Sequence, residues 1–156
     1  VHFIGHLQTN KVRKVVGLAT LIQSVDSLRL LEAIEKEAAK QGIVQDILLE
    51  VNIGEEEAKS GFAPDAIFEA AEIAKTKEDV RVCGLMTIPP FDADRDTNMQ
   101  YFRQVRALYV DINEKLFHNE LECISMGMSG DFADAIRAGA TMVRVGTAIF
   151  GTRYYT

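Results

Sequence analysis

Short, nearly continuous apolar runs alternate along the chain with longer stretches that have helical spacing. The runs are rich in Val, Ile and Leu and show little polar–apolar alternation, which is typical of strands covered on both faces. Six such strands are predicted, over residues 1–7, 20–27, 45–54, 80–88, 121–129 and 141–151. The pattern therefore predicts a sheet that is buried on both sides.

The segments between these strands carry the helical pattern. After the second strand, Leu31, Ile34 and Ala38 recur at three- and four-residue steps, and Gly42 supplies the stop. Pro64 opens the next helix, because proline fixes φ early in the first turn. The predicted helices cover residues 28–42, 63–77, 97–116 and 133–140.

Strict alternation of strands and helices indicates right-handed βαβ crossovers and a parallel α/β sheet. No GxGxxG motif follows the first strand and no Walker-type lysine loop occurs, so dinucleotide-binding and P-loop folds lose support. A (β/α)8 TIM-barrel type of fold agrees better with the pattern, although only about six βα units are present. Such a barrel needs about 250 residues, and six parallel strands would leave two hydrophobic edges unpaired.

The chain also opens at Val1 inside a strand-like run, without an initiating Met. We therefore expect residues 1–156 to form a single partial TIM-barrel domain whose first two βα units are missing from the N-terminus.

Composition narrows the function classes. The 156 residues are 47% hydrophobic and 26% charged, with a net charge of −6, which argues against a nucleic-acid or anionic-membrane surface. No apolar run reaches the roughly 20 residues that span a bilayer, and no signal peptide is visible. Cys83 and Cys123 fall in predicted strands and are expected to be buried free thiols, which favours a cytoplasmic protein. His2 and His6 lie too far apart on a strand to share a metal ion.

Polar residues collect where the predicted strands end, which is where barrel enzymes and binding proteins place their chemistry. They are costly within apolar strands unless they have partners, so their gathering at one rim is a functional signal. The polar residues at the strand ends are His6, Gln8, Asn10, Ser24, Asp26, Asn52, Thr87, Ser125, Ser129, Arg144 and Thr147; Gly54, Met86, Gly146 and the rest of the run Ser125–Ser129 stand beside them.

The last two strand ends predict an anion pocket. Gly146 and Thr147 follow the sixth strand, and the segment "SMGMSGD" (125–131) follows the fifth. Glycine backbone amides and Ser or Thr hydroxyls bind phosphate oxygens, and loops after the last two barrel strands often form such a site. The alternative is a pair of tight turns, with Asp131 as a helix N-cap. Arg144 lies between two valines and needs a partner, which is either an acidic residue or a ligand.

Several longer motifs resemble one known family. They are "HFIGHLQTNK", "QSVDS", "LLEVNIGEEEAKSGF", "GLMTIPP", "SMGMSGDF" and "GATMVRVGTAIFGTR", and they extend over the whole chain. The family is that of the pyridoxal phosphate homeostasis proteins, of the YggS or PROSC type. It is related to the barrel domain of alanine racemases, and its members carry pyridoxal 5′-phosphate (PLP) on a lysine.

The resemblance implies a set of cofactor contacts. Arg144 would face the pyridine nitrogen and keep it unprotonated, which makes the cofactor a poor electron sink. The phosphate would be held by Ser129, Gly146 and Thr147 with nearby backbone amides. The remaining cofactor-binding residues would be Ser125, Met126 and Gly127 in the loop after the fifth strand, and His6, Asn52 and Met86 on the ring side.

The Schiff-base lysine of the family lies near the end of the first barrel strand, so it is expected in the missing N-terminal segment. The lysines present fall on predicted helices or loops and none is assigned this role; they are Lys11, Lys14, Lys36, Lys40, Lys59, Lys75, Lys77 and Lys115.

The leading hypothesis is a non-catalytic PLP-binding protein that buffers or delivers the cofactor inside the cell. We expect a monomer, with transient contacts to PLP-dependent apoenzymes. Three alternatives remain open: a PLP-dependent enzyme like an amino-acid racemase, a PLP-independent phosphate-binding TIM-barrel enzyme, and a fragment that binds nothing. The second alternative needs an acid–base pair, for which Asp26 and Glu50 are the candidates.

Overall fold

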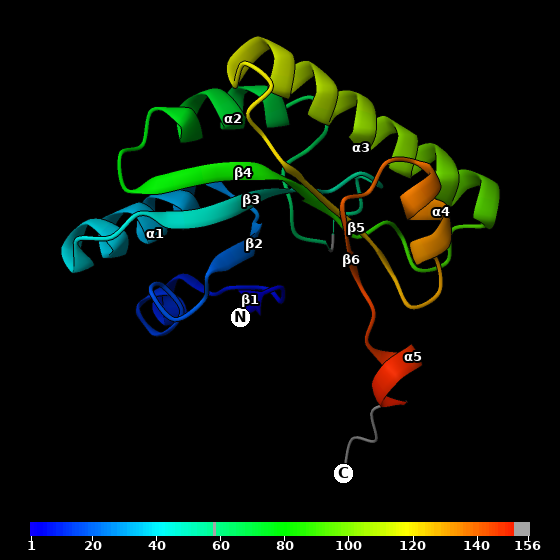
Figure 1. Cartoon of the computed structure of the whole chain (residues 1–156), viewed down its shortest axis with the longest axis horizontal. Helices are drawn as coiled ribbons and strands as arrows, with labels where there is room; N and C mark the ends of the chain where they lie inside the picture. Colours follow the sequence, from blue (N-terminus) through cyan, green and yellow to red (C-terminus); the bar gives the residue numbers. More distant parts are fainter. Residues whose placement is uncertain (58, 152–156) are drawn as a thin grey trace.

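A computed structural model describes residues 1–57 and 59–151, in which the strands form one parallel sheet in the order β1-β2-β3-β4-β5-β6. The sheet curls into a half-barrel, as Figure 1 shows, which confirms the α/β barrel type expected from the sequence. The strands are β1 (His2–Phe3), β2 (Leu21–Val25), β3 (Gln45–Val51), β4 (Val80–Thr87), β5 (Cys123–Met128) and β6 (Met142–Arg144).

The helices follow the strands in turn and lie on the outer side of the curled sheet, except for the last one, which projects away from it (Figure 1). They are the 3-10 helix η1 (Thr9–Lys14) and the α-helices α1 (Leu28–Gln41), α2 (Ile67–Lys75), α3 (Arg95–Leu116), α4 (Phe132–Arg137) and α5 (Thr147–Phe150).

The end of helix α1 is set by Gly42, as the sequence indicated, while the caps Ser27 and Asp94 were not anticipated. Ser27 accepts a hydrogen bond from the Leu30 amide at the start of α1, and Gly42 ends that helix with a φ of 67°. Asp94 caps α3 through the Thr97 amide. Helix α2, however, begins at Ile67 rather than at Pro64, because residues 63–66 form a separate turn closed by the Ala66 amide and the Ala63 carbonyl.

The two terminal strands are much shorter than predicted. Strand β1 has two residues rather than seven, and residues 4–8 leave the sheet. The predicted strand 141–151 splits into β6 and helix α5, because Gly146 turns the backbone out of the extended region with φ −116° and ψ −77°. The apolar run "TAIF" that looked like a strand is therefore one helical turn.

The two faces of the sheet differ in what covers them. The face toward the helices carries the main core, in which Ile47, Leu49 and Ile124 pack with helix residues such as Ile34 and Phe102. The inner face carries a smaller cluster of Leu21, Leu48, Met86 and Cys123, with Cys83 and Met142 packed against it. Both cysteines thus lie in strands, as predicted.

No helix in the described part of the chain has the apolar length that a bilayer crossing requires.

Gly84 lies at an irregularity in β4, where the register with β3 shifts between the pairs Val82–Ile47 and Gly84–Leu48. It has a φ of +155°, and a Cβ at this position would lie 1.7 Å from the carbonyl oxygen of Cys123 on β5. Because that oxygen is backbone, only a shift of β4 against β5 would make room. Glycine therefore permits the close approach of the two strands that carry much of the inner face.

We predict that Gly84→Ala lowers the free energy of unfolding by roughly 3 kcal/mol or more, because the added methyl group forces the two strands apart. Urea denaturation followed by circular dichroism measures the change. Gly5→Ala is the control: no heavy atom lies within 4 Å of its Cβ position, so the effect should stay within about 0.5 kcal/mol. Equal denaturation midpoints for the two variants would contradict this explanation.

Candidate functional site

A row of three side chains crosses the inner face near the carboxyl ends of the strands. Glu50 on β3 pairs with Met86 on β4, and Met86 pairs with Ser125 on β5. Directly paired residues of parallel strands point to the same side of a sheet, so the three side chains lie next to one another. Met86 and Ser125 are fully buried and Glu50 is 8% exposed. This row is the floor of the candidate site.

Arg144 connects the ends of β4, β5 and β6 beside this row. Its Nη1 donates to Ser125 Oγ and its Nη2 donates to the Thr87 carbonyl oxygen at 2.8 Å, so one side chain of β6 reaches both β5 and β4. Arg144 Nε is buried and has no hydrogen-bond partner among the described residues. Burial lowers the pKa of the guanidinium, while the charge of Glu50 opposes that shift.

The sequence left open whether Arg144 pairs with an acidic residue or with a ligand, and its partners in the structure answer this only in part. In the structure they are the neutral oxygens of Ser125 and Thr87 rather than a carboxylate at ion-pair distance. A buried cation that is held by neutral groups and keeps one donor free is costly unless another acceptor joins it. The arrangement therefore favours a ligand acceptor at Nε.

Gln23 extends this network and was not among the expected site residues. The Ser125 hydroxyl donates to Gln23 Oε1 at 2.6 Å, and Gln23 Nε2 lies 3.1 Å from His2 Nδ1. The signal was present in the run "LIQSV", where a buried glutamine stands in an apolar strand. Its role depends on contacts with residues about 20 and 100 positions away, which sequence spacing does not reveal.

Two carboxylates lie at the other end of the row. Asp26 Oδ2 is 3.1 Å from His6 Nδ1, which is also 3.2 Å from Ser60 Oγ. Burial raises the pKa of Glu50 to about 7; the charge of Asp26 adds to this shift, and Arg144 and His6 counteract it. The site thus contains a carboxyl group that changes its protonation near neutral pH.

The predicted phosphate loops do come together. Ser129 Oγ accepts hydrogen bonds from the Gly146 amide at 3.0 Å and from the Ala148 amide at 3.3 Å, which joins the loop after β5 to the start of α5. The Gly146 amide is thereby occupied, so it is not free to bind an anion as the sequence suggested. The exposed hydroxyl of Thr147 and the hydroxyl proton of Ser129 remain as donors.

Gly127 and Asp131 shape the loop after β5. Gly127 has a φ of +95°, and a Cβ there would lie 2.6 Å from Ala135 Cβ, so glycine allows helix α4 to pack closely. Asp131 stands at the N-cap position of α4 without a capping bond from its side chain. Its carboxylate instead accepts from the Met128 amide at 2.6 Å and from Asn98 Nδ2 at 2.8 Å.

The side chains of two expected site residues, Asn52 and Met126, do not take part in this cluster. Asn52 braces the acidic loop, with Nδ2 donating to the Glu56 carbonyl at 2.9 Å and Oδ1 accepting from the Glu56 amide at 3.3 Å. Met126 is fully buried in the core between sheet and helices, on the opposite face from Ser125.

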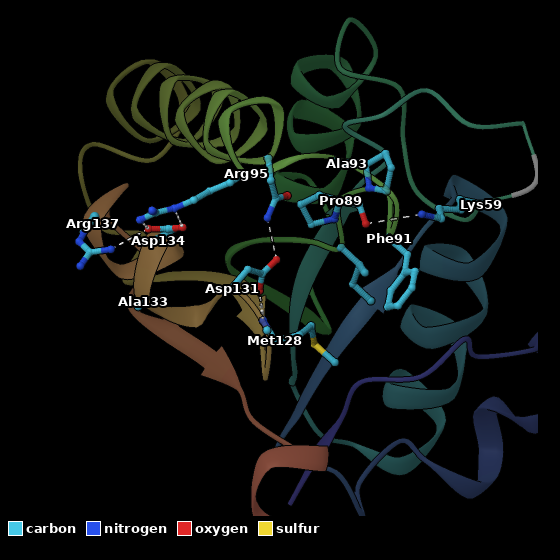
Figure 2. Close-up of a pocket in the computed structure, with 14 residues that line it drawn as sticks. Lys59, Pro89, Phe91, Ala93, Arg95, Met128, Asp131, Ala133, Asp134 and Arg137 are labelled. Carbon is cyan, nitrogen blue, oxygen red and sulfur yellow. Dashed lines mark hydrogen bonds and ion pairs between the residues drawn. The ribbon is translucent and has the colours of Figure 1, made fainter. Parts of the chain in front are cut away.

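A separate pocket of about 750 Å³ opens between the loops after β4 and β5, as Figure 2 shows. Pro89 and Phe91 form its apolar side, and Arg95 and Arg137 pair with Asp134 on the opposite side. None of the predicted cofactor contacts lines it, although Met128 at the end of β5 belongs to its wall. It is therefore a neighbour of the polar row and not the same site.

Comparison with known proteins identifies the family to which the chain belongs. Residues 1–154 match the family model of the alanine racemase N-terminal domain. Alanine racemase from Clostridium difficile superimposes with a TM-score of 0.69 over 97% of the chain at 16% identity, which supports the fold.

Closer relatives narrow the class further. The pyridoxal phosphate homeostasis protein of Aquifex aeolicus is 46% identical over 99% of the chain, which spans 67% of that relative, and the one of Pseudomonas aeruginosa is 38% identical, with 65% of its length spanned. The chain therefore belongs to the family of pyridoxal phosphate homeostasis proteins.

Solved structures agree with this placement. An unknown protein from Bifidobacterium adolescentis has a TM-score of 0.91 at 40% identity, with 96% of this chain and 60% of that chain covered. PipY of Synechococcus elongatus, determined with PLP bound, has a TM-score of 0.86 at 31% identity, with 96% and 69% covered. The present chain thus spans about two thirds of the length of its relatives.

We predict that Arg144→Lys lowers the free energy of unfolding by about 1–3 kcal/mol, because one ammonium group cannot replace a guanidinium fork that bonds Ser125 and Thr87 together. Chemical denaturation measures the change. Arg81→Lys is the matched control, because Arg81 also forms a forked contact, with Asp46, but is 69% exposed; its loss should cost less than about 1 kcal/mol. A larger loss for Arg81→Lys would contradict the importance given to Arg144.

Proposed function

We propose that the protein binds PLP at the carboxyl ends of β1–β6 and holds it for buffering or delivery, without turning over a substrate. The observation that carries this proposal is the buried guanidinium of Arg144. Two of its nitrogens are fixed by Ser125 and Thr87, and Nε is buried without a partner among the described residues. The homologous PipY, whose structure was determined with PLP bound, adds support from a relative.

The residues present fit the chemistry of the cofactor. The free donor on Arg144 suits the acceptor nitrogen of a pyridine ring, and the apolar side chain of Met86 provides a floor for its face. The hydroxyls of Ser129 and Thr147, in the loops after β5 and β6, are donors for a phosphate group. His6 stands at the rim beside Asp26. When bound, PLP supplies an aldehyde that reacts with amines.

We place the Schiff-base lysine and the two remaining βα units outside residues 1–156. The support is that the chain spans 67% of the Aquifex relative, and that β1 and β6 are edge strands of the sheet. Every lysine of the chain that is described lies on a helix or in a loop: Lys11, Lys14, Lys36, Lys40, Lys59, Lys75, Lys77 and Lys115. None of them is on an inner-face strand position.

We further propose that the protein acts in the cytoplasm as a monomer that makes transient contacts with PLP-dependent apoenzymes. A carrier has to release its cargo, so the contacts with recipients would be small and short-lived. Free cysteines at Cys83 and Cys123 agree with a reducing compartment.

The phosphate end of the site can be tested with a single hydroxyl. We predict that Thr147→Ala weakens the binding of pyridoxine 5′-phosphate about tenfold or more, because one hydrogen bond to a charged phosphate is lost. Pyridoxine 5′-phosphate is chosen because it lacks the aldehyde and so needs no lysine. Isothermal titration calorimetry measures the dissociation constant.

Thr76→Ala provides the matched control for this variant, because Thr76 lies at the end of α2 and its hydroxyl donates to the Ile73 carbonyl. Its affinity for pyridoxine 5′-phosphate should equal that of the wild type. Equal affinities for both variants would remove Thr147 from the phosphate site, and an absence of binding by all three proteins would overturn the proposed function.

One observation favours an enzyme instead: Glu50 has a pKa of about 7 and lies near Asp26, as an acid–base catalyst would. We predict that the protein with added PLP converts L-alanine to D-alanine no faster than free PLP does. Chiral chromatography of the products, with an alanine racemase as positive control, measures this. A rate well above free PLP that is lost in Glu50→Gln would replace the carrier hypothesis with the enzyme.

A further inference from the structure

Glu50 is the one carboxyl group in the buried row of the candidate site. It is 8% exposed, and among the described residues its carboxylate has neither an ion pair nor a hydrogen bond from a side chain. Its paired neighbour on β4 is the apolar Met86, which offers no hydrogen bond or opposite charge to the carboxylate. A charge buried to this degree usually has a partner or loses its ionisation.

The charged groups around Glu50 come from three other elements. Asp26 follows β2, His6 follows β1, and Arg144 belongs to β6; Asp26 raises the pKa of Glu50, while the other two lower it. Asp26 is itself engaged with His6 at 3.1 Å. The guanidinium that would meet the cofactor is thus the same group that an ionised Glu50 would attract.

We propose that the Glu50 carboxyl is a positioning residue of the PLP site that couples cofactor binding to the uptake of one proton. This inference rests on the proposed function. When it is protonated, Glu50 is uncharged, so Arg144 remains available to donate a hydrogen bond to the pyridine ring. Once ionised, Glu50 repels an anionic cofactor and attracts the positive charge of Arg144, which weakens the interaction of Arg144 with the cofactor.

The direction of the coupling follows from the burial of the group. The pKa of Glu50 is about 7 without ligand. A bound phosphate ester adds negative charge and excludes water, and both effects raise the pKa of a carboxyl further. The bound state therefore holds the proton more tightly than the free state. Affinity is independent of Glu50 below about pH 7 and falls as pH rises above it, by at most about tenfold per pH unit for a single group.

The experiment compares three proteins by calorimetry with pyridoxine 5′-phosphate between pH 6 and 8.5. Glu50→Gln keeps the shape of the protonated carboxyl, so its affinity should stay close to the wild-type value at pH 6 across the range, apart from the titration of the ligand itself. Wild type should lose a further fivefold or more between pH 7 and 8.5. Glu57→Gln, which removes an exposed negative charge nearby in the chain, should follow the wild type.

The outcomes separate the inference from the proposed function. If all proteins bind at pH 6 and Glu50→Gln shows the same pH dependence as wild type, the coupling through Glu50 is wrong while PLP binding stands. If none of the three proteins binds at any pH, the proposed function is wrong and the inference fails with it. Asp26→Asn gives an independent check that leaves Glu50 in place. Removing the charge that raises the pKa of Glu50 should start the loss of affinity at a lower pH, and an unchanged onset would also overturn the inference.

Discussion

The hydrogen bonds of one buried guanidinium organise the functional edge of this half-barrel. Arg144 joins three neighbouring strands, since it lies on β6 and donates to Ser125 on β5 and to the Thr87 carbonyl on β4. Through Ser125 the contact continues to Gln23 on β2, without passing along the sheet hydrogen bonds. A network of this kind fixes the relative positions of strand ends whose loops are otherwise free to vary. The polar row depends on it, because Ser125 is a member of both.

A guanidinium is well suited to this position because it stays charged despite the lowering of its pKa by burial. In the proposed PLP complex it would present a permanent donor to the ring nitrogen and would discourage protonation of that nitrogen. An unprotonated pyridine withdraws electrons weakly, so the arrangement suits holding the cofactor better than driving bond cleavage at it. The carrier hypothesis is consistent with this electrostatic property of Arg144.

Much of the fold was predictable because it depends on local patterns. Strand and helix alternation, the stop at Gly42 and the apolar strands all follow from residues close in sequence. The failures occurred where tertiary contacts decide: β6 ends at Arg144 because Gly146 turns the chain, and the apolar "TAIF" then forms a helix. Gln23 was missed for the same reason, since its partners lie far away in sequence. Resemblance to a family indicated Arg144 and Ser125, but not the row that connects them to Glu50.

The buried carboxyl of Glu50 limits how strongly the candidate site can bind an anionic ligand. A binding site for an anion gains from Arg144, yet the same buried region contains a carboxyl that costs free energy when it ionises. The cost is smallest when the carboxyl stays protonated, which holds below its pKa of about 7. Because a protein that stores a cofactor must also release it, an affinity that varies with conditions is more useful than a maximal one. Under the proposed carrier function, ionisation of Glu50 would weaken cofactor binding and favour release, whereas the guanidinium of Arg144 would favour binding.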